Sequence, residues 1–200
     1  MIEIKDLSFA HGKNQIFTGF DAVVQDKCAT LLSGPNGSGK TTLLQLIGGV
    51  LKPRAGSIEI NGKDISSLSS KEQAEIRSIS PQRRIFELAF TVEEILAIIK
   101  PKNRAHHADA VIDALDLRQI FTSKITELSL GQQQRVSVAL ALIQRADFYL
   151  LDEPFSAQDS EYTEKLLALI ALLSKETGVL VISHNTGLIA QYFNERIELA

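Results

Sequence analysis

The sequence has little of several things, and each shortage excludes a class of protein. Its 200 residues include one cysteine, Cys28, and no tryptophan, so no disulfide can form within the chain. No apolar run approaches the roughly 20 residues of a membrane span. Lysine and arginine number 21 against 24 acidic residues, a net charge of −3. The chain therefore lacks the overall basic charge typical of proteins that bind nucleic acid or anionic membranes.

These absences fit a protein made and kept in the reducing cytoplasm. Residues 1–5 alternate like a strand and lack the apolar core of a signal peptide, so we expect no leader. Cys28 precedes an apolar run, and we expect its thiol to be buried and inert. Any action at a membrane would then need another component as the anchor.

Short apolar segments alternate with helical patterns, which predicts an α/β fold. The predicted strands cover residues 2–9, 17–24, 30–32, 57–60, 148–151, 179–182 and 196–199. One helix is predicted to follow Gly39, and a helical stretch over residues 92–122 is predicted to break at Pro101. Another helix is predicted after Ser129, its N-cap, and a last one over residues 163–173, with Gly178 as the stop. Asn61-Gly62 predicts a hairpin turn. We expect one domain, with a core of residues 1–82 and about 147–200 and an inserted helical subdomain of about 83–146.

A glycine-rich segment carries the clearest chemical pattern. Residues 34–41 fit G-x-x-x-x-G-K-[ST] at every fixed position, between an apolar strand and an apolar-faced helix. Such glycines let backbone N–H groups surround phosphate oxygens, and the helix N-terminus adds about half a positive charge. Lys40 is predicted to contact the β- and γ-phosphates, and Thr41 to bind Mg²⁺. The candidate nucleotide ligands are Gly34, Pro35, Asn36, Gly37, Ser38, Gly39, Lys40, Thr41 and Thr42.

Two acids end a later apolar strand. Asp152 and Glu153 directly follow residues 148–151, and buried carboxylates are costly unless they serve a cation or a reaction. Asp152 suits the Mg²⁺ shell, while Glu153 points elsewhere and suits polarising an attacking water. The phosphate loop alone leaves kinases, GTPases and ATPases open.

Further motifs narrow the choice. Residues 128–132, Leu-Ser-Leu-Gly-Gln, resemble the LSGGQ signature of ABC-type ATPases, and residues 133–136 continue it. Residues 151–154 with 156–159 resemble the Walker B and D-loop of that family. Residues 182–185 look like its H-loop, and residues 80–82 like its Q-loop. The motifs stand in family order over nearly the whole chain, so the resemblance implies a P-loop core of the ABC-ATPase type with N-terminal antiparallel strands.

The resemblance also implies roles for individual residues. Gln82 would sense the γ-phosphate and Mg²⁺ and link the core to the helical lobe. From the N-terminus of their helix, the signature residues Ser129, Gly131 and Gln132 would meet ATP held by a second copy. Asp159 would communicate across the dimer interface. His184 would bond the γ-phosphate and help to hold the attacking water, which makes it catalytic together with Glu153 and Gln82.

Three positions depart from the family pattern. Leu130 stands where the signature usually has its first glycine, although Ser129 and Gly131 are retained. Gln158 replaces the usual leucine of the D-loop. His11 falls where an aromatic residue usually stacks on adenine, and imidazole stacks less strongly than tyrosine.

Two other groups of residues carry weaker predictions. After Gln82, residues 84–90 place Phe86, Leu88 and Phe90 at alternate positions, and we expect two of these in the core and one in a docking groove. His106 and His107 have no motif support and are expected to be solvated helix residues.

The resemblance implies an ATP-binding and ATP-hydrolysing transporter subunit that uses ATP and Mg²⁺. It would pair as a homodimer, or with a homologous ATPase, and act on integral membrane permease subunits with a substrate-binding protein as a further partner. Nucleic acid is not an expected partner. The chain would lie in the cytoplasm, peripheral on the inner face of the cell membrane. Residues 64–82 look like ATPases of metal-chelate, haem or cobalamin importers, but the cargo and the direction, import or export, stay open.

The alternative is a soluble ABC ATPase in iron–sulfur assembly, DNA or translation. Relatives acting on DNA carry long coiled-coil insertions, and translation factors fuse two cassettes. Iron–sulfur assembly relatives usually close the signature with glutamate, where this chain has Gln132. Because 16 residues follow His184, we also expect no C-terminal regulatory domain.

Overall fold

The structure, a computed structural model, describes residues 1–156, 158–184, 186–187 and 189–200. The strands are β1 (Ile2–His11), β2 (Asn14–Val24), β3 (Ala29–Ser33), β4 (Ala55–Ile60), β5 (Lys63–Asp64), β6 (Arg77–Ser80), β7 (Phe148–Asp152), β8 (Gly178–Ile182) and β9 (Glu195–Glu198). The α-helices are α1 (Lys40–Ile47), α2 (Ser70–Ile76), α3 (Val92–Ala97), α4 (Ala108–Ala114), α5 (Leu130–Leu142) and α6 (Ser160–Leu173).

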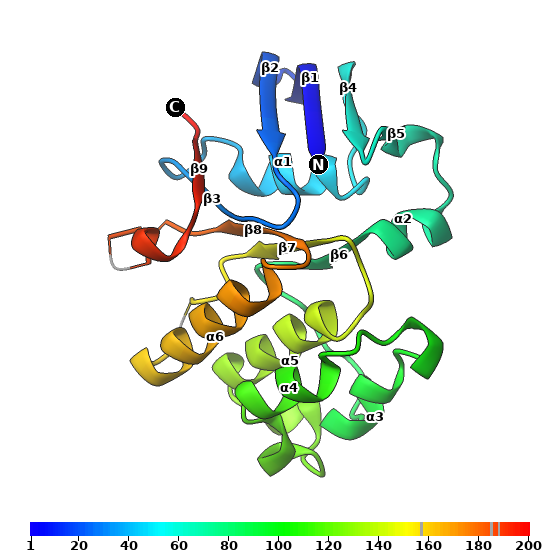
Figure 1. Ribbon diagram of the computed structural model, residues 1–200, viewed down its shortest axis with the longest axis vertical. Coiled ribbons are helices and arrows are strands. Elements are labelled where there is room, and N and C mark those ends of the chain that lie inside the picture. Colours follow the sequence, from blue (N-terminus) through cyan, green and yellow to red (C-terminus); the bar gives the residue numbers. More distant parts are fainter. Residues whose placement is uncertain (157, 185, 188) are drawn as a thin grey trace.

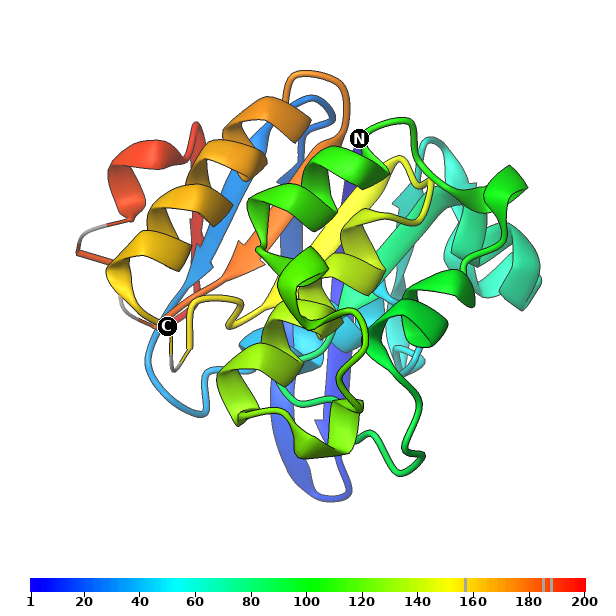
Figure 2. The same cartoon turned by 90° about the horizontal axis from the view of Figure 1, so that it is seen from below.

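Two sheets lie one above the other with α1 between them, as Figure 1 shows. The antiparallel sheet has the order β2-β1-β4-β5, and the parallel sheet has the order β6-β7-β8-β3-β9. The other face of the parallel sheet is covered by α4, α5 and α6 (Figure 2). The predicted α/β fold with N-terminal antiparallel strands is confirmed.

The central strands are buried because their sequences are apolar on both faces. Every residue of β7 and β8 is buried, as are the first four of β3. Side chains alternate between the two faces of a strand, so neighbours join different cores. Leu150 and Leu180 pack with α1 between the two sheets, whereas Leu151 and Val181 pack on the helical side.

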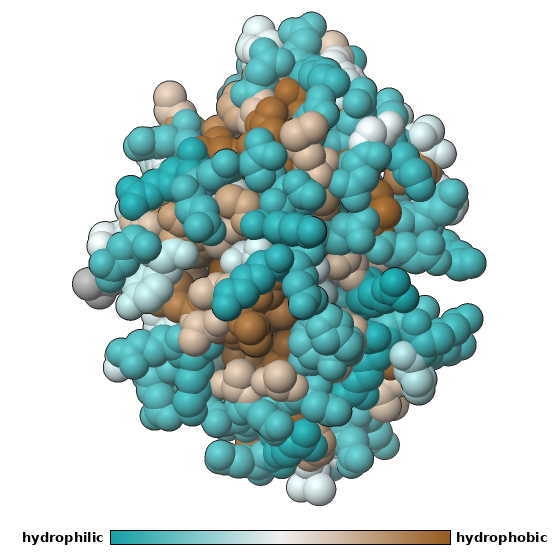
Figure 3. Space-filling view, viewed as in Figure 1, coloured by the Kyte–Doolittle hydropathy of each residue, from teal (hydrophilic) through white to brown (hydrophobic). Residues whose placement is uncertain are grey.

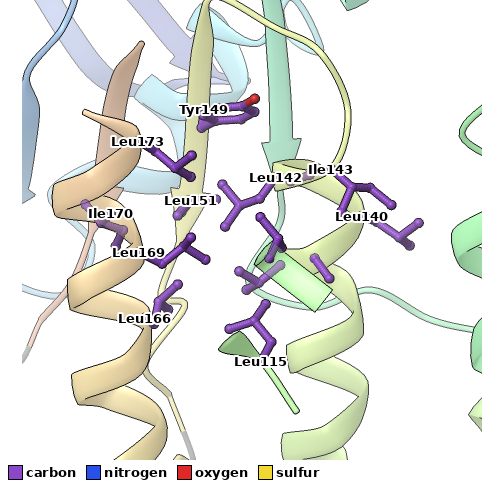
Figure 4. Packing of buried hydrophobic residues seen from close by; sticks show 14 of the residues in the cluster. Leu115, Leu140, Leu142, Ile143, Tyr149, Leu151, Leu166, Leu169, Ile170 and Leu173 are labelled. Carbon is purple, nitrogen blue, oxygen red and sulfur yellow. The ribbon is translucent and has the colours of Figure 1, made fainter. Parts of the chain in front are cut away.

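The helical-side core joins α5 and α6 to the parallel sheet. Figure 4 shows Leu142 of α5 and Leu166 and Ile170 of α6 converging on Leu151 of β7. All four side chains are at most 1% exposed. This packing fixes α5 against the strand that carries the two acids.

Side-chain caps begin several helices where the sequence predicts them. Ser129 accepts a hydrogen bond from the backbone N–H of Gln132, and the Gln132 side chain accepts one from the backbone of Ser129. Such a capping box satisfies N–H groups that the first helical turn leaves free. The predicted N-cap at Ser129 is confirmed. The predicted hairpin is also confirmed, since Ile60 pairs with Lys63 across Asn61-Gly62.

The sequence did not predict β6 or α2. Strand β6 lies at one edge of the parallel sheet and pairs with β7, yet Ile79 is its one apolar residue. Its inward side chains are Ser78 and Ser80, both buried, and the Ser80 hydroxyl lies 3.4 Å from that of Ser137. An apolar run therefore cannot reveal this strand.

Three other expectations were wrong. Gly178 begins β8 and does not stop the preceding helix, which ends at Leu173. Two of the residues Phe86, Leu88 and Phe90 were expected in the core, but only Phe86 packs there, while Leu88 and Phe90 are exposed. His107 is half-buried and precedes α4; its imidazole Nε2 lies 3.0 Å from the carbonyl oxygen of Leu142 and 3.2 Å from the hydroxyl of Tyr149.

Cys28 is buried, as expected, and burial raises the pKa of its thiol. Among the described helices, none combines the length and the apolar character needed to cross a bilayer. The face in Figure 3 is mostly hydrophilic, with small apolar areas between polar side chains.

Candidate active site

The candidate residues gather because parallel strands present their carboxyl ends at one edge of the sheet. The P-loop (residues 34–41) follows β3, Asp152 ends β7 and Glu153 follows it, and His184 is the second residue after β8. These three strands are neighbours in the order β7-β8-β3. Gln82 follows β6 at the other side of β7. The fold thus explains why residues far apart in sequence share one edge.

The backbone of the P-loop accepts hydrogen bonds from the lysine of the same loop. Lys40 is the first residue of α1, and its Nζ donates to the carbonyl oxygens of Gly34 and Pro35, at 2.8 Å each. The lysine is 8% exposed. The backbone around the ammonium is thus already curled, as a phosphate cradle requires.

Two glycines of the loop cannot be replaced without a clash. Gly34 has φ +148°, and a Cβ there would lie 2.5 Å from the carbonyl oxygen of Leu199. Gly39 has φ +96°, and a Cβ there would lie 2.6 Å from the Ile16 side chain and 2.8 Å from that of Phe17. Both fixed glycines of the pattern G-x-x-x-x-G are therefore required by close packing, Gly39 against β2 and Gly34 against Leu199, the residue after β9.

The remaining predicted ligands of the loop are accessible to different degrees. Pro35, Asn36, Gly37 and Thr41 are exposed, whereas Ser38 and Thr42 are half-buried. The backbone N–H of Ser38 donates to the carbonyl of Pro35, which closes a turn over Asn36 and Gly37. Because residues 35–37 are exposed above the buried Lys40, an anion can reach the loop from solvent.

Asp152 is buried with spare bonding capacity. It is 1% exposed, and its Oδ1 has no hydrogen-bond partner within the described residues. Burial raises the pKa of its carboxyl, while a hydrogen bond from Thr41 and the charge of Lys40 act in the opposite direction. A buried carboxylate oxygen without a partner is costly unless a further group binds it. The Thr41 and Asp152 oxygens therefore fit a divalent cation.

Glu153 adopts a backbone conformation that is rare for its type. Its φ is +50°, in the left-handed region, and its N–H donates to the carbonyl of Ile182. Its Oε2 lies 2.8 Å from Nδ1 of His184. Glu153 is 6% exposed, whereas the His184 side chain is 60% exposed. Strained conformations of this kind persist where the surroundings fix them, often at active sites.

The contact between Glu153 and His184 is a feature that sequence reasoning missed. The two residues are 31 positions apart, and only the pairing of β7 with β8 brings them together. Both line a hollow of about 560 Å³ whose walls also include Gln158, Asp159 and Tyr192. The site therefore has room for a ligand beside the paired carboxylate and imidazole.

The signature residues lie elsewhere. Ser129 and Leu130 are exposed at the start of α5, and Gly131 and Gln132 are half-buried. Among the described residues, no hydrogen bond links this segment to the P-loop of the same chain. Leu130 is 69% exposed, so the residue that replaces a glycine has room for its side chain.

Asp159 begins α6 and also holds a neighbouring helix. Its Oδ1 accepts from the backbone N–H of Tyr162, and its Oδ2 lies 2.9 Å from Nη2 of Arg135 on α5. These bonds, led by that from the Tyr162 backbone, hold the pKa of the Asp159 carboxyl below its usual range. Within the predicted D-loop and H-loop, Ala157 and Asn185 lie outside the described residues.

Two predicted ligands stand apart from the residues above. Gln82 is exposed and lines a pocket of about 340 Å³ with Leu130, Gln134 and Ser156. No hydrogen bond within the described residues connects Gln82 to Thr41 or Asp152. His11 is exposed at the end of β1, with its ring centroid 4.9 Å from that of Phe9 in an edge-to-face arrangement. The structure brings neither into the cluster formed by Lys40 and the acids.

Comparison with known proteins agrees with this geometry. The profile of the ABC transporter family matches residues 18–156. The hemin import ATP-binding protein HmuV of Rhizobium meliloti is 34% identical over 210 residues, covering 98% of this chain and 80% of that protein. The zinc uptake system ATP-binding protein ZurA of Listeria innocua is 33% identical over 213 residues, covering 100% and 82%.

Solved structures show the same fold. The dimeric structure of MJ0796, a bacterial ABC transporter cassette, has a TM-score of 0.87 at 25% identity, covering 100% of this chain and 94% of that one. The resemblance inferred from the motifs is therefore confirmed, and the transporter reading is favoured over a soluble ATPase of another process. The chain belongs to the ABC transporter family, as the subunit that binds and hydrolyses ATP.

Proposed function

We propose that two copies of this chain, or one copy and a homologous ATPase, close around two ATP molecules and drive import through a separate membrane permease. The observation that carries this proposal is the separation of two half-sites. The P-loop and the signature segment share no hydrogen bond among the described residues, yet both present exposed groups. One chain offers half of an ATP site, and a second chain supplies the other half. The dimeric cassette MJ0796 supports such pairing.

The P-loop binds the phosphates of ATP. Lys40 Nζ now donates to the carbonyls of Gly34 and Pro35, and phosphate oxygens offer it stronger acceptors. The N-terminus of α1 adds its dipole and free N–H groups. Substrate binding therefore exchanges two neutral carbonyl partners of the ammonium for charged ones.

Thr41 and Asp152 would hold Mg²⁺. Their fit rests on the Asp152 Oδ1 that lacks a partner among the described residues and on hard oxygen donors, which Mg²⁺ prefers. When bound, the ion would supply positive charge that offsets the charge of the phosphates. Gln82 would join this shell only after the loop that follows β6 moves toward β7.

Glu153 acts as general base. Its carboxylate takes a proton from water as the water oxygen attacks the γ-phosphorus and the bond to the ADP oxygen breaks, which yields ADP and phosphate. His184 orients that carboxylate through the 2.8 Å contact of Nδ1 with Oε2 and extends toward the γ-phosphate. Because Glu153 is almost fully buried and the His184 side chain is 60% exposed, the carboxylate would stay fixed while the imidazole would be accessible to the γ-phosphate.

The second chain completes each site. Ser129, Gly131 and Gln132, at the start of α5, would meet the γ-phosphate bound by the partner's P-loop. Asp159 would contact the partner across the interface, and His11 would stack on adenine. ATP then binds the closed dimer better than the open one, so its hydrolysis lets the dimer open.

A permease would dock beside Gln82. Ile85, Leu88 and Phe90 are 79%, 64% and 45% exposed, and Arg83 is exposed with them. Neighbouring apolar side chains that face solvent are typical of an interaction surface. These residues open the proposed helical subdomain, about 83–146, directly after the first part of the proposed core, which comprises residues 1–82 and about 147–200. The chain would thereby sit peripherally on the cytoplasmic face of the membrane.

The cargo class follows from the relatives. Some relatives are named for hemin import and others for zinc uptake or probable iron chelatin transport. We infer an importer of a metal or a metal chelate, supplied by a substrate-binding protein. Nucleic acid has no part in this function.

Co-purification tests the transport role. A tagged chain, solubilised from membranes in mild detergent, should carry a polytopic membrane protein, and vesicles holding both should take up hemin or zinc when ATP is present. Replacing Leu88 and Phe90 together by serine should release the permease while the ATPase activity of the isolated chain persists. A chain that purifies without a membrane protein and hydrolyses ATP alone in cells would contradict the proposal.

A further inference from the structure

The side-chain amide of Gln158 joins two segments of the chain. Its Nε2 donates to the carbonyl oxygen of Gly131 at 2.9 Å, and its Oε1 accepts from Nε of Arg135 at 3.0 Å. Both partners belong to α5, whereas Gln158 stands two residues before α6. The amide therefore uses its donor and its acceptor in one bridge, which a leucine at this position could not form.

Arg135 extends the bridge. Its Nη2 lies 2.9 Å from Asp159 Oδ2, and its guanidinium carbon lies 4.7 Å from the centroid of the Tyr162 ring. The Arg135 side chain is 21% exposed and that of Asp159 is 61% exposed, so only the guanidinium end of this ion pair is partly desolvated. One arginine of α5 thus holds Gln158 and the first turn of α6 together.

The bridge connects the signature segment at the start of α5 with the segment that follows Glu153. Gly131 lies in the first helical turn of α5, among the signature residues, and Gln158 lies five residues after Glu153. Behind this contact, α5 and α6 pack through their leucines (Figure 4), and those side chains lie deeper in the core than the first turn of α5. The polar bridge holds that turn toward α6, while the Gln133 amide holds it to the preceding segment by donating to the carbonyl oxygens of Ile125 and Leu128.

The structure assigns Gln158 a positioning role: it holds the signature turn in the orientation that meets the partner's ATP, and it ties that turn to the segment carrying Glu153. This assignment rests on the proposed pairing of two chains around ATP. Without the bridge, dimer formation must first order the turn, which weakens association, while nucleotide binding to the P-loop of a single chain is unaffected.

The test compares ATP-dependent dimers in a Glu153→Gln background. Sedimentation equilibrium with MgATP should give a dimer dissociation constant about tenfold higher when Gln158→Leu is added, the effect expected when each of the two chains loses about one hydrogen bond that orders its signature turn. ADP binding to the single chain, measured at low protein concentration, should not change. Gln119→Leu removes the same amide from an exposed position in the segment after α4 and serves as the matched control.

Two further variants separate positioning from simple loss of stability. Gln158→Glu keeps the acceptor for Arg135 but faces the Gly131 carbonyl with a carboxylate, so it should weaken the dimer as much as leucine does. Combining Gln158→Leu with Arg135→Ala should cost less than the sum of the single changes, because both remove one bridge. A dimer unchanged by Gln158→Leu would overturn the assignment. A Glu153→Gln protein that stays monomeric with ATP would overturn the proposed pairing, and with it the assignment.

Discussion

Replacing Glu153 by glutamine probes the hydrolytic step with little disturbance of the fold. The amide has the shape of the carboxylate, and its oxygen can still accept from Nδ1 of His184, now 2.8 Å from Glu153 Oε2. The left-handed backbone at φ +50° is no less favourable for glutamine than for glutamate. What the variant loses is the basic oxygen that takes a proton from water.

The magnitude follows from the role of a general base. Such a base contributes roughly 10²- to 10⁴-fold to a rate. At about 1.4 kcal/mol for each factor of ten, the activation free energy should rise by about 3 to 5 kcal/mol. ATP affinity should change little, because the contacts of Lys40 and the P-loop are untouched.

The assay is steady-state phosphate release, with nucleotide binding measured in parallel. Glu164→Gln is a matched control, since this exposed glutamate of α6 lines the same hollow. It should hydrolyse ATP within about twofold of the parent, as expected for a surface change. Turnover by Glu153→Gln equal to that of this control would refute the role assigned to Glu153.

Three further predictions concern the loop, its packing and a buried histidine. Lys40→Ala should lower ATP affinity about ten- to hundredfold, the loss of one charge-assisted contact, as read by equilibrium nucleotide binding; unchanged affinity would remove Lys40 from the site. Gly39→Ala should lower the free energy of unfolding by about 1 to 3 kcal/mol in urea, because its Cβ would meet Ile16 at a positive φ, and equal stability would show that the loop relaxes. Burial lowers the pKa of His107 below its ordinary 6.5. Because the unfolded chain then takes up the proton first, the free energy of unfolding should fall as the pH drops below 6.5. In urea titrations at several pH values, His107→Phe should flatten this pH dependence, and an unchanged pH dependence would contradict the prediction.

The parts of the fold that were predictable from sequence are those with local signals. The apolar runs of β7 and β8 indicate buried strands. A glycine pattern of this kind between a strand and a helix is rarely anything other than a phosphate-binding loop. Ser129 caps α5 through contacts within three residues. Each of these features depends on neighbours in the chain, so pattern reasoning reached them.

The parts that were missed depend on contacts between distant segments. Strand β6 is stabilised by pairing with β7 and by burial of Ser80, neither of which leaves an apolar pattern. The contact between Glu153 and His184 exists because β7 and β8 are neighbours. Leu88 and Phe90 are exposed, although hydrophobicity alone would assign them to the core, and we propose that a partner protein covers them.

Gln158 shows the limit most clearly. Read as a sequence position, it is a small departure from the family pattern. In the fold it bridges Gly131 and Arg135, because α5 and α6 pack side by side on the parallel sheet. Polar side chains of this kind gain a role only when tertiary structure supplies the partner.

The central claim is that each ATP site is built from two chains, and a mixing experiment tests it most directly. Lys40→Ala breaks the P-loop and Gly131→Asp breaks the signature, so each variant alone should be nearly inactive. In a mixed dimer, the intact P-loop of one chain faces the intact signature of the other. Hydrolysis by the mixture well above the sum of the separate proteins is the predicted result. A mixture no more active than that sum would contradict the shared site.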